Sequence, residues 1–298
     1  ILGFVLASLL SFIPAYYYLR SIRNAEEDDI EPWSALGTAF AWGAISGVFL
    51  AGIFNALGTS LILVFLAEAD SGFSFEDTAI IVGAVLVAPI VEEFVKPLVM
   101  LRSDTVRKEI DEIEDGIIYG AACGLGFGAT ENILYGLTEG LALAGFAGLA
   151  FLIVIRTVSS ILLHLVATSY TGYGISRYLV GNESFVVVIK YYILAVLIHA
   201  AWNAAAVTGS PFILLFSIVL AIGGLEFSKR RIRELDLNQH ATYGEIEKKL
   251  SLEGANLLIQ CLRSLENGSS KFINQDDSQA TYAKKINRLH ETACSLPV

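Results

Sequence analysis

The sequence predicts an all-α polytopic membrane protein with about seven transmembrane helices and a small C-terminal helical tail. Hydrophobic residues make up 54% of the 298 residues, and the mean hydropathy is +0.60. Charged residues make up only 17%, against about 25% in soluble domains. The polar residues also gather after residue 228. We therefore expect two domains, a transmembrane core at 1–228 and a cytoplasmic helical tail at 229–298.

The expected spans are apolar stretches that reach the roughly 20 residues needed to cross a bilayer as a helix. They cover residues 1–19, 34–66, 77–101, 116–139, 143–176, 185–208 and 210–228. The second and fifth are too long for a helix perpendicular to the membrane. We expect the second to break near 55–58, leaving a short interfacial piece at 59–67. We expect the fifth to begin with an interfacial segment around 141–148.

Basic residues fix the expected orientation in the cell membrane. They follow the first, third, fifth and last spans, at Arg20, Arg23, Arg102, Arg107, Lys108, Arg177, Lys229, Arg230, Arg231 and Arg233. The alternate loops contain no Lys or Arg. Because basic loops stay on the cytoplasmic side, we expect the N-terminus outside and the C-terminus in the cytoplasm. The first stretch lacks the basic start and cleavage site of a signal peptide, so we interpret it as a span.

Charge and cysteine content exclude other classes of protein. The formal net charge of -10 argues against nucleic acid as a partner. The three cysteines show no paired pattern, which argues against a disulfide framework or a zinc ribbon. In the tail, apolar residues at helical spacing over 246–265 and a second helix-prone stretch at 279–291 predict a helical hairpin.

Ionisable residues inside the apolar spans are the main indication of function. They are the pair Glu92 and Glu93, then Glu131, His164 and His199, from four separate spans. A charge at the bilayer centre costs about 2.5 to 3.5 kcal/mol on insertion scales, so such residues are rare and usually functional. Carboxylates and imidazoles together are the components of a buried water-activating or metal-binding site.

The third span carries two adjacent acids and a lysine. Glu92 and Glu93 point about 100° apart on a helix, and Lys96 falls between them, within reach of either. Two neighbouring acids cannot both face one point, so we expect one to act on water or metal and the other to orient it. The alternative is an acid–lysine cluster that only packs helices. Pro89 and Pro97 can kink this span and free backbone groups near the pair.

The fourth span has a row of small residues at four-residue spacing. The row consists of Gly116, Gly120, Gly124, Gly128 and Gly136. Such rows let helices approach closely in lipid, which would bring a neighbouring helix beside Glu131 and Asn132. Phe127 precedes Glu131 by one turn and could exclude water or contact substrate.

The fifth and sixth spans each present polar side chains on one face. In the fifth, the polar stripe is Arg156, Ser160, His164, Thr168 and Gly172. Arg156 could neutralise a carboxylate or hold backbone carbonyls. In the sixth, His199 and Asn203 lie one turn apart with Trp202 between them. Asn203 could bind an oxyanion or steer an imidazole.

Two imidazoles with carboxylates match the ligand set of a catalytic divalent metal such as zinc. The ligands we expect are Glu93, Glu131, His164 and His199. A glutamate would take the proton of the activated water. A metal-free mechanism is also workable, in which a glutamate activates water directly while histidine and asparagine stabilise the oxyanion. There is no HExxH motif, which excludes a zincin-type soluble metalloprotease.

Taken in order, these motifs resemble the PrsW family of intramembrane proteases. EExxK lies at 92–96, FxxxEN at 127–132, the histidine-to-glycine segment at 164–172 and HxxWN at 199–203. The resemblance covers about residues 1–228. It implies a multi-pass metallopeptidase with the glutamates and histidines as its active residues. It also implies membrane-anchored protein substrates. Members of the family are linked to the cleavage of membrane-bound anti-sigma factors.

A more distant likeness joins the chain to the CAAX-processing and bacteriocin-immunity membrane proteases. Their motifs are EExxxR, FxxxH and HxxxN. Here Lys96 stands one position before their arginine, and Glu131 replaces their histidine. His199 and Asn203 fit the third motif.

The expected function is therefore that of an intramembrane endopeptidase, embedded in the lipid bilayer, that hydrolyses membrane-anchored proteins. The alternatives are a transporter or channel using the same cluster, and a non-catalytic membrane scaffold. A transporter would favour an internal repeat, and no clear repeat is present. The expected catalytic residues are Glu92, Glu93, Glu131, His164, His199 and Asn203. The expected supporting residues are Lys96, Phe127, Asn132, Arg156 and Trp202.

Overall fold

The computed structural model describes residues 1–27, 30–68, 78–79, 81–207 and 210–249. Every regular element in these ranges is helical. Four helical stretches of this part are long and apolar enough to cross a membrane: Leu2–Arg23, Trp33–Leu66, Asp115–Leu179 and Val186–Val207. The chain divides into two compact units, Ile1–Asp236 and Leu237–Val298. The predicted tail hairpin lies almost wholly outside the described residues.

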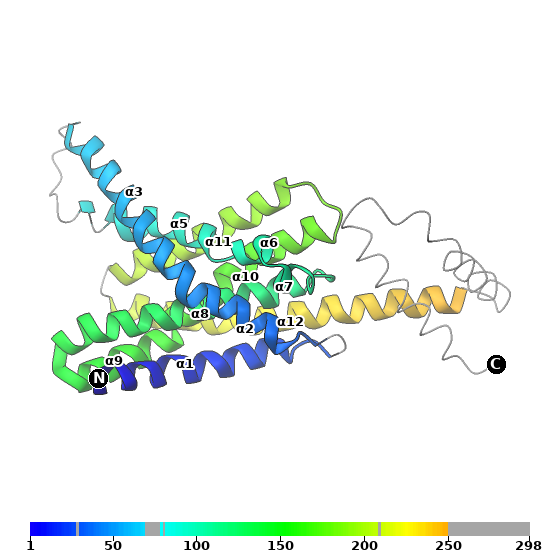
Figure 1. Cartoon of the computed structure of the whole chain (residues 1–298), viewed down its shortest axis with the longest axis horizontal. Helices are drawn as coiled ribbons and strands as arrows, with labels where there is room; N and C mark the ends of the chain where they lie inside the picture. The colour runs from blue at the N-terminus through cyan, green and yellow to red at the C-terminus, as the bar shows by residue number, and fades with distance from the viewer. Residues whose placement is uncertain (28–29, 69–77, 80, 208–209, 250–298) are drawn as a thin grey trace. The chain divides into compact units, whose positions relative to one another are not determined.

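The second span is one continuous helical run made of α2 (Trp33–Ala41), η1 (Trp42–Gly47) and α3 (Val48–Glu68), drawn in blue in Figure 1. The predicted break near 55–58 is wrong, because α3 continues through it. The polar residue there does not end the helix, since Asn55 Nδ2 donates a hydrogen bond to Glu92 Oε1 at 3.2 Å. The irregularity comes earlier, as the wide π-helical turn η1.

The third span is interrupted at its proline, as predicted. η2 (Val82–Val87) leads into α5 (Ala88–Val95), and α6 (Leu98–Arg102) starts after Pro97. Pro97 has no N–H to bond the carbonyl of the preceding turn, so the α5 helix ends there. The kink leaves the carbonyl of Val95 to accept a hydrogen bond from Trp42 Nε1 at 3.1 Å. A short helix, α7 (Asp104–Arg107), follows.

The fourth and fifth spans are joined by a sharp reversal. α8 (Asp115–Tyr135) passes through η3 (Gly136–Gly140) into α9 (Leu141–Val158). The chain reverses at Ala144 and Gly145, where Gly145 adopts φ 59°, a conformation that only glycine takes readily. This reversal lies within the segment at 141–148, whose location at the membrane interface stays a prediction. α10 (Ser160–Leu179) follows α9 after a non-helical Ser159.

The glycine row of α8 packs against α10, as predicted. A Cβ atom at Gly124 would lie 2.2 Å from the carbonyl oxygen of His164, and one at Gly120 would lie 2.5 Å from that of Thr168. Only glycine allows the two backbones this close. α8 is thus enclosed by α1 (Leu2–Arg23), α2 and α10, and it forms the centre of the core. Two further helices complete the described part, α11 (Val186–Val207) and α12 (Pro211–Lys249).

Candidate active site

The ionisable residues of four helices meet in one buried cluster. Glu92 and Glu93 come from α5, Glu131 from α8, His164 from α10 and His199 from α11. The ring centroids of the two histidines are 4.9 Å apart. Both rings are about 98–99% buried, so they face other helices and not lipid. The sequence prediction that these groups gather at one place is borne out by this geometry.

Glu93 is the best-held carboxylate of the cluster. Its oxygens accept from Lys96 Nζ at 2.8 Å, from Thr168 Oγ1 at 2.9 Å and from His199 Nδ1 at 2.8 Å. A carboxylate only accepts, so Nδ1 of His199 carries the proton and Nε2 presents a lone pair. Glu93 therefore orients the His199 ring.

Glu92 is held on one side only. Its Oε1 accepts from Asn55, while its Oε2 is buried and has no hydrogen-bond partner. The nearest positive or polar groups to Oε2 are Lys96 Nζ at 3.4 Å and His199 Nε2 at 3.8 Å, both too long for a good hydrogen bond. An uncommitted carboxylate oxygen thus faces an uncommitted imidazole nitrogen. The two adjacent glutamates differ in surroundings in the way their spacing suggested.

Glu131 is fixed by the arginine of the neighbouring helix. Arg156 Nη2 donates to Glu131 Oε2 at 2.6 Å, and Arg156 Nε donates to Asn132 Oδ1 at 2.9 Å. The guanidinium also lies 3.9 Å from the ring centroid of Tyr135. Of the two roles considered for Arg156, the structure thus shows neutralisation of a carboxylate.

His164 bridges the lysine and Glu131. Its Nδ1 lies 2.8 Å from Lys96 Nζ, and its Nε2 lies 3.0 Å from Glu131 Oε2. An ammonium only donates, so in this arrangement Nδ1 accepts and Nε2 carries the proton. Phe127 forms one wall, with its ring 5.3 Å from that of His164 and 4.3 Å from Lys96 Nζ. Phe127 therefore lines the cluster, and its role, excluding water or contacting substrate, stays a prediction.

The side-chain amide of Asn203 bonds the backbone of η2. Its Nδ2 donates to the carbonyl of Ala84 at 2.7 Å. In the wide turn η2, Ala88 N–H bonds the carbonyl five residues back, at Gly83. The next residue, Pro89, has no N–H to give to Ala84 in the same way, so Asn203 supplies that donor. The two roles considered for Asn203, binding an oxyanion or steering an imidazole, stay predictions.

Sequence reasoning missed two residues that hold the glutamates. Thr168 was placed on the polar stripe but not in the site, and Asn55 was interpreted as a helix break. An asparagine within a long apolar span is the signal that could have revealed Asn55, because a polar group in lipid needs a partner. Trp202 Nε1 is buried without a hydrogen-bond partner.

Three of these residues offer ligand atoms close enough for one metal ion. Ligand atoms of Glu92, His164 and His199 lie within 4.8 Å of one another. The free Glu92 Oε2 fits such an ion without rearrangement. His164 would bind it after releasing a present partner. Glu93 and Glu131, which the sequence analysis also counted as ligands, are not members of this group, whereas Glu92 is.

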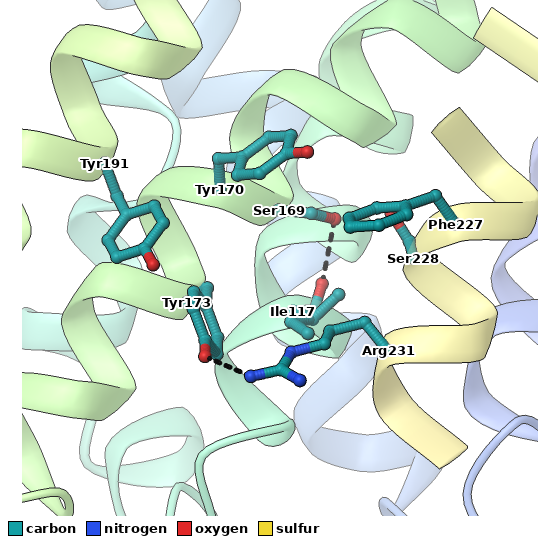
Figure 2. A pocket seen from close by; sticks show the side chains of 8 residues that line it. All are labelled: Ile117, Ser169, Tyr170, Tyr173, Tyr191, Phe227, Ser228 and Arg231. Atoms are coloured by element: carbon teal, nitrogen blue, oxygen red, sulfur yellow. Dashed lines mark hydrogen bonds between the residues drawn. The ribbon is translucent and has the colours of Figure 1, made fainter. Parts of the chain in front are cut away.

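A pocket of about 140 Å³ lies elsewhere, between α8, α10, α11 and α12 (Figure 2). It is lined mainly by aromatic side chains, and Arg231 Nη2 donates to Tyr173 Oη at 3.0 Å. The pocket shares no residue with the buried cluster. The candidate site is therefore a closely packed polar centre and does not belong to this pocket.

Comparison with known proteins gives consistent matches. The model of the family described as PrsW family intramembrane metalloprotease matches residues 31–223. The protein named Protease PrsW from Clostridioides difficile (strain 630) is 32% identical over 177 residues, which cover 59% of this chain and 68% of that protein. Protease PrsW from Geobacillus kaustophilus (strain HTA426) is 46% identical over 130 residues, 44% of this chain and 49% of that protein. No solved structure matches.

Proposed function

The chain belongs to the PrsW family of intramembrane metalloproteases, which are hydrolases, and from this premise we propose which residues carry the reaction. Glu92, His164 and His199 bind a divalent metal, and Glu131 accepts the proton of the attacking water. The single observation that carries this assignment is the buried, unbonded Oε2 of Glu92, which faces Nε2 of His199. Lys96 Nζ forms an ion pair with this oxygen at 3.4 Å, and a buried carboxylate oxygen that accepts no hydrogen bond is costly unless a closer cation or a water completes it.

Zinc suits this donor set of two imidazoles and one carboxylate with an open position. When bound, the metal would activate a water molecule near neutral pH and polarise the scissile carbonyl. Glu93 holds Nδ1–H of His199, so that Nε2 points at the metal position. Thr168 and Lys96 in turn hold Glu93. Such outer hydrogen bonds fix the ring orientation of metal-binding histidines.

Glu131 is the acid best placed to accept a proton. Its side chain is 21% exposed, whereas Glu92 and Glu93 are 6% and 0% exposed. Arg156 holds one of its oxygens in place, and the same oxygen reaches His164. A proton taken from water by Glu131 can then pass to the leaving amine. The ammonium group of Lys96 lies between Glu92 and Glu93. It stabilises the negative charge that develops on the substrate carbonyl oxygen.

The substrate class is a membrane-anchored protein whose single helix enters from the lipid, with anti-sigma factors as the candidate that the family suggests. The helix that covers Glu92, α3, belongs to the span with the least burial. Only 6% of its most apolar stretch is buried, against 61% in the Asp115–Leu179 span. A seam between α3 and α5 would therefore open at the lowest cost. The layout of seven spans, with the N-terminus outside and the C-terminus in the cytoplasm of the cell, belongs to the same proposal.

The test is cleavage of a single-span substrate protein in reconstituted membranes. Glu92→Gln keeps the size of the side chain and removes its charge, so cleavage should fall at least about 100-fold, as for loss of a metal ligand or a catalytic group. Glu139→Gln, an exposed acid in η3, is the matched control and should cleave normally. Equal turnover by Glu92→Gln and the wild type would reject the assignment.

Metal removal separates the metal mechanism from the metal-free one. Elemental analysis of the purified protein should find about one zinc ion, as expected for a catalytic site. Chelation should abolish cleavage, and added zinc should restore it. Full activity in protein shown to be free of metal would reject the metal mechanism and support hydrolysis by the glutamates and histidines alone.

A further inference from the structure

A second group of acidic residues is buried outside the site described above. It lies where the loop between α1 and α2 meets the segment before α8 and the middle of α12. The members are less than 9% exposed and are Glu26, Glu31, Glu112, Glu114, Asp115 and Asp236. None of them takes part in the proposed peptidase chemistry. So many acids in one buried place need an explanation, because buried carboxylates are normally paired.

Glu26 lies at the centre of this group and is unsatisfied. Its side chain is only 1% exposed, and neither carboxylate oxygen has a hydrogen-bond partner. It belongs to both sets of acids whose ligand atoms lie within 4.8 Å of one another. One set adds Glu31 and Asp115, and the other adds Glu112 and Glu114. Glu26 therefore directs two free acceptor atoms into a shell of other carboxylates.

Asp115 and Glu31 are each held on one side. Asp115 Oδ2 accepts from the backbone N–H of Asp111 at 2.9 Å and from that of Glu112 at 2.6 Å. Glu31 Oε2 accepts from the hydroxyl of the buried Tyr119. These bonds fix the position of each carboxyl group, and the two carboxyl groups also hydrogen-bond each other. Carboxylate oxygens that could serve as metal ligands are therefore held in place around Glu26.

We propose that Glu26, Glu31 and Asp115 bind a hard divalent cation, Ca²⁺ or Mg²⁺, in a site separate from the peptidase centre. Carboxylate oxygens are the ligands that such cations prefer, whereas the imidazoles of the peptidase centre suit zinc. Glu112 and Glu114 form a second set with Glu26 and supply further carboxylate oxygens next to it.

Protons compete with a cation for these carboxylates, so cation binding would depend on pH. Burial and the neighbouring carboxylates raise the pKa of Glu26 to about 9. Burial likewise raises the pKa of Glu31 and of Glu114 to about 7 each. Without a cation the group therefore retains protons near neutral pH, and a bound cation would replace them.

Cation binding would also bear on how α12 is held. The backbone N–H of Glu27, next to the central ligand, donates to Asp236 Oδ2 of α12 at 3.0 Å. Fixing Glu26 therefore fixes one attachment point of α12, the helix that contains the last predicted span. The site would join three segments that are far apart in the sequence.

The experiment is a calorimetric titration of purified, chelator-washed full-length protein with Ca²⁺, and separately with Mg²⁺. Titration to about 10 mM exceeds the weakest calcium modules, whose dissociation constants are about 1 mM. Wild-type protein should bind one of the two ions saturably. Glu26→Gln and Glu31→Gln should each weaken binding at least about tenfold, as for loss of a ligand. Glu31→Gln keeps the test decisive if Glu26→Gln does not fold.

Two controls locate the ion. Glu226→Gln alters an acid that is 52% exposed, so it should bind as the wild type does. Glu92→Gln, which disables the proposed peptidase centre, should also bind Ca²⁺ or Mg²⁺ normally. Absence of saturable binding in the wild type, or equal binding in wild type, Glu26→Gln and Glu31→Gln, would overturn the proposal. Loss of binding in Glu92→Gln alone would place the ion in the peptidase centre and overturn it as well.

Discussion

Adjacent side chains at Glu92 and Glu93 have different surroundings because a helix turns about 100° per residue. Glu93 faces α10 and α11, where Thr168 and His199 bond it. Glu92 Oε1 faces α3, where Asn55 bonds it, while its Oε2 lies 3.8 Å from His199 Nε2 of α11. Lys96 lies between them and reaches both. The different neighbours of the two carboxylates therefore give them different roles in the proposed mechanism.

The Thr168 hydroxyl provides a test of the proposed support of Glu93. Thr168→Val keeps the shape and removes the donor, so the His199 ring should lose part of its orientation. We expect zinc affinity to fall about 10-fold to 100-fold, with activity recovering at high zinc concentration. Competition with a zinc-binding dye measures this change.

Thr171→Val is the matched control on the same helix. The hydroxyl of Thr171 is buried and has no hydrogen-bond partner, so its removal breaks no bond. Its zinc affinity should match that of the wild type. Equal affinities for Thr168→Val and Thr171→Val would show that the bond to Glu93 does not support the metal position.

At the scale of elements, the contact between α8 and α10 decides where His164 lies. The glycine row lets the α8 backbone reach the His164 carbonyl, which places the imidazole beside Glu131 and Lys96. The kink at Pro97 and the wide turn η2 then set α5 against α3 and α11. Each irregularity is adjacent to a residue of the site.

Gly124→Ala should therefore damage both stability and activity. The new methyl group would lie 2.2 Å from a backbone oxygen, which a flexible side chain cannot relieve. Overpacking of this kind costs about 1 to 3 kcal/mol or more. We expect a lower thermal unfolding midpoint and at least partial loss of cleavage.

Gly52→Ala in α3 is the control, because nothing lies within 4 Å of the added atom. It should leave stability unchanged or raise it slightly, since alanine favours helix. If both alanine variants behaved alike, the close approach of α8 and α10 would not be essential.

At the scale of the whole molecule, the buried acids around Glu26 make stability depend on pH. The groups that face Glu26 from the packed elements are carboxylic, namely Glu31, Glu112, Glu114, Asp115 and Asp236. The pKa of Glu26, raised to about 9, lies above its value in the unfolded chain. The folded state thus binds more protons, and stability is lost as pH rises through the folded pKa.

We therefore expect the thermal unfolding midpoint of chelator-treated protein to decrease as the pH is raised from 6 to 9. Each kcal/mol lost from the free energy of unfolding lowers the midpoint by about 2 to 4 °C in a protein of 150 to 250 residues. A shift of this size can be measured. Glu26→Gln should flatten this dependence, and saturating Ca²⁺ or Mg²⁺ should oppose it. A midpoint that rises over this range would contradict the expectation.

Several features followed from the sequence because they depend on composition or on spacing within one helix. These are the helical membrane class, the position of Lys96 between Glu92 and Glu93, and the glycine row of α8. The sequence also placed most of the cluster in the right spans, because ionisable residues in lipid need partners. Spacing along one helix fixes which face a residue occupies, and these predictions used nothing more.

Other features depend on how separate helices meet, and only the tertiary structure decided them. Asn55 contacts Glu92 because α3 crosses α5 there, and Asn203 bonds Ala84 because Pro89 leaves that carbonyl without a donor. Glu26 meets acids from two distant segments, the one that leads into α8 and the middle of α12. The periodicity of one helix carries no information about its distance or rotation relative to another, since those come from packing across the whole core.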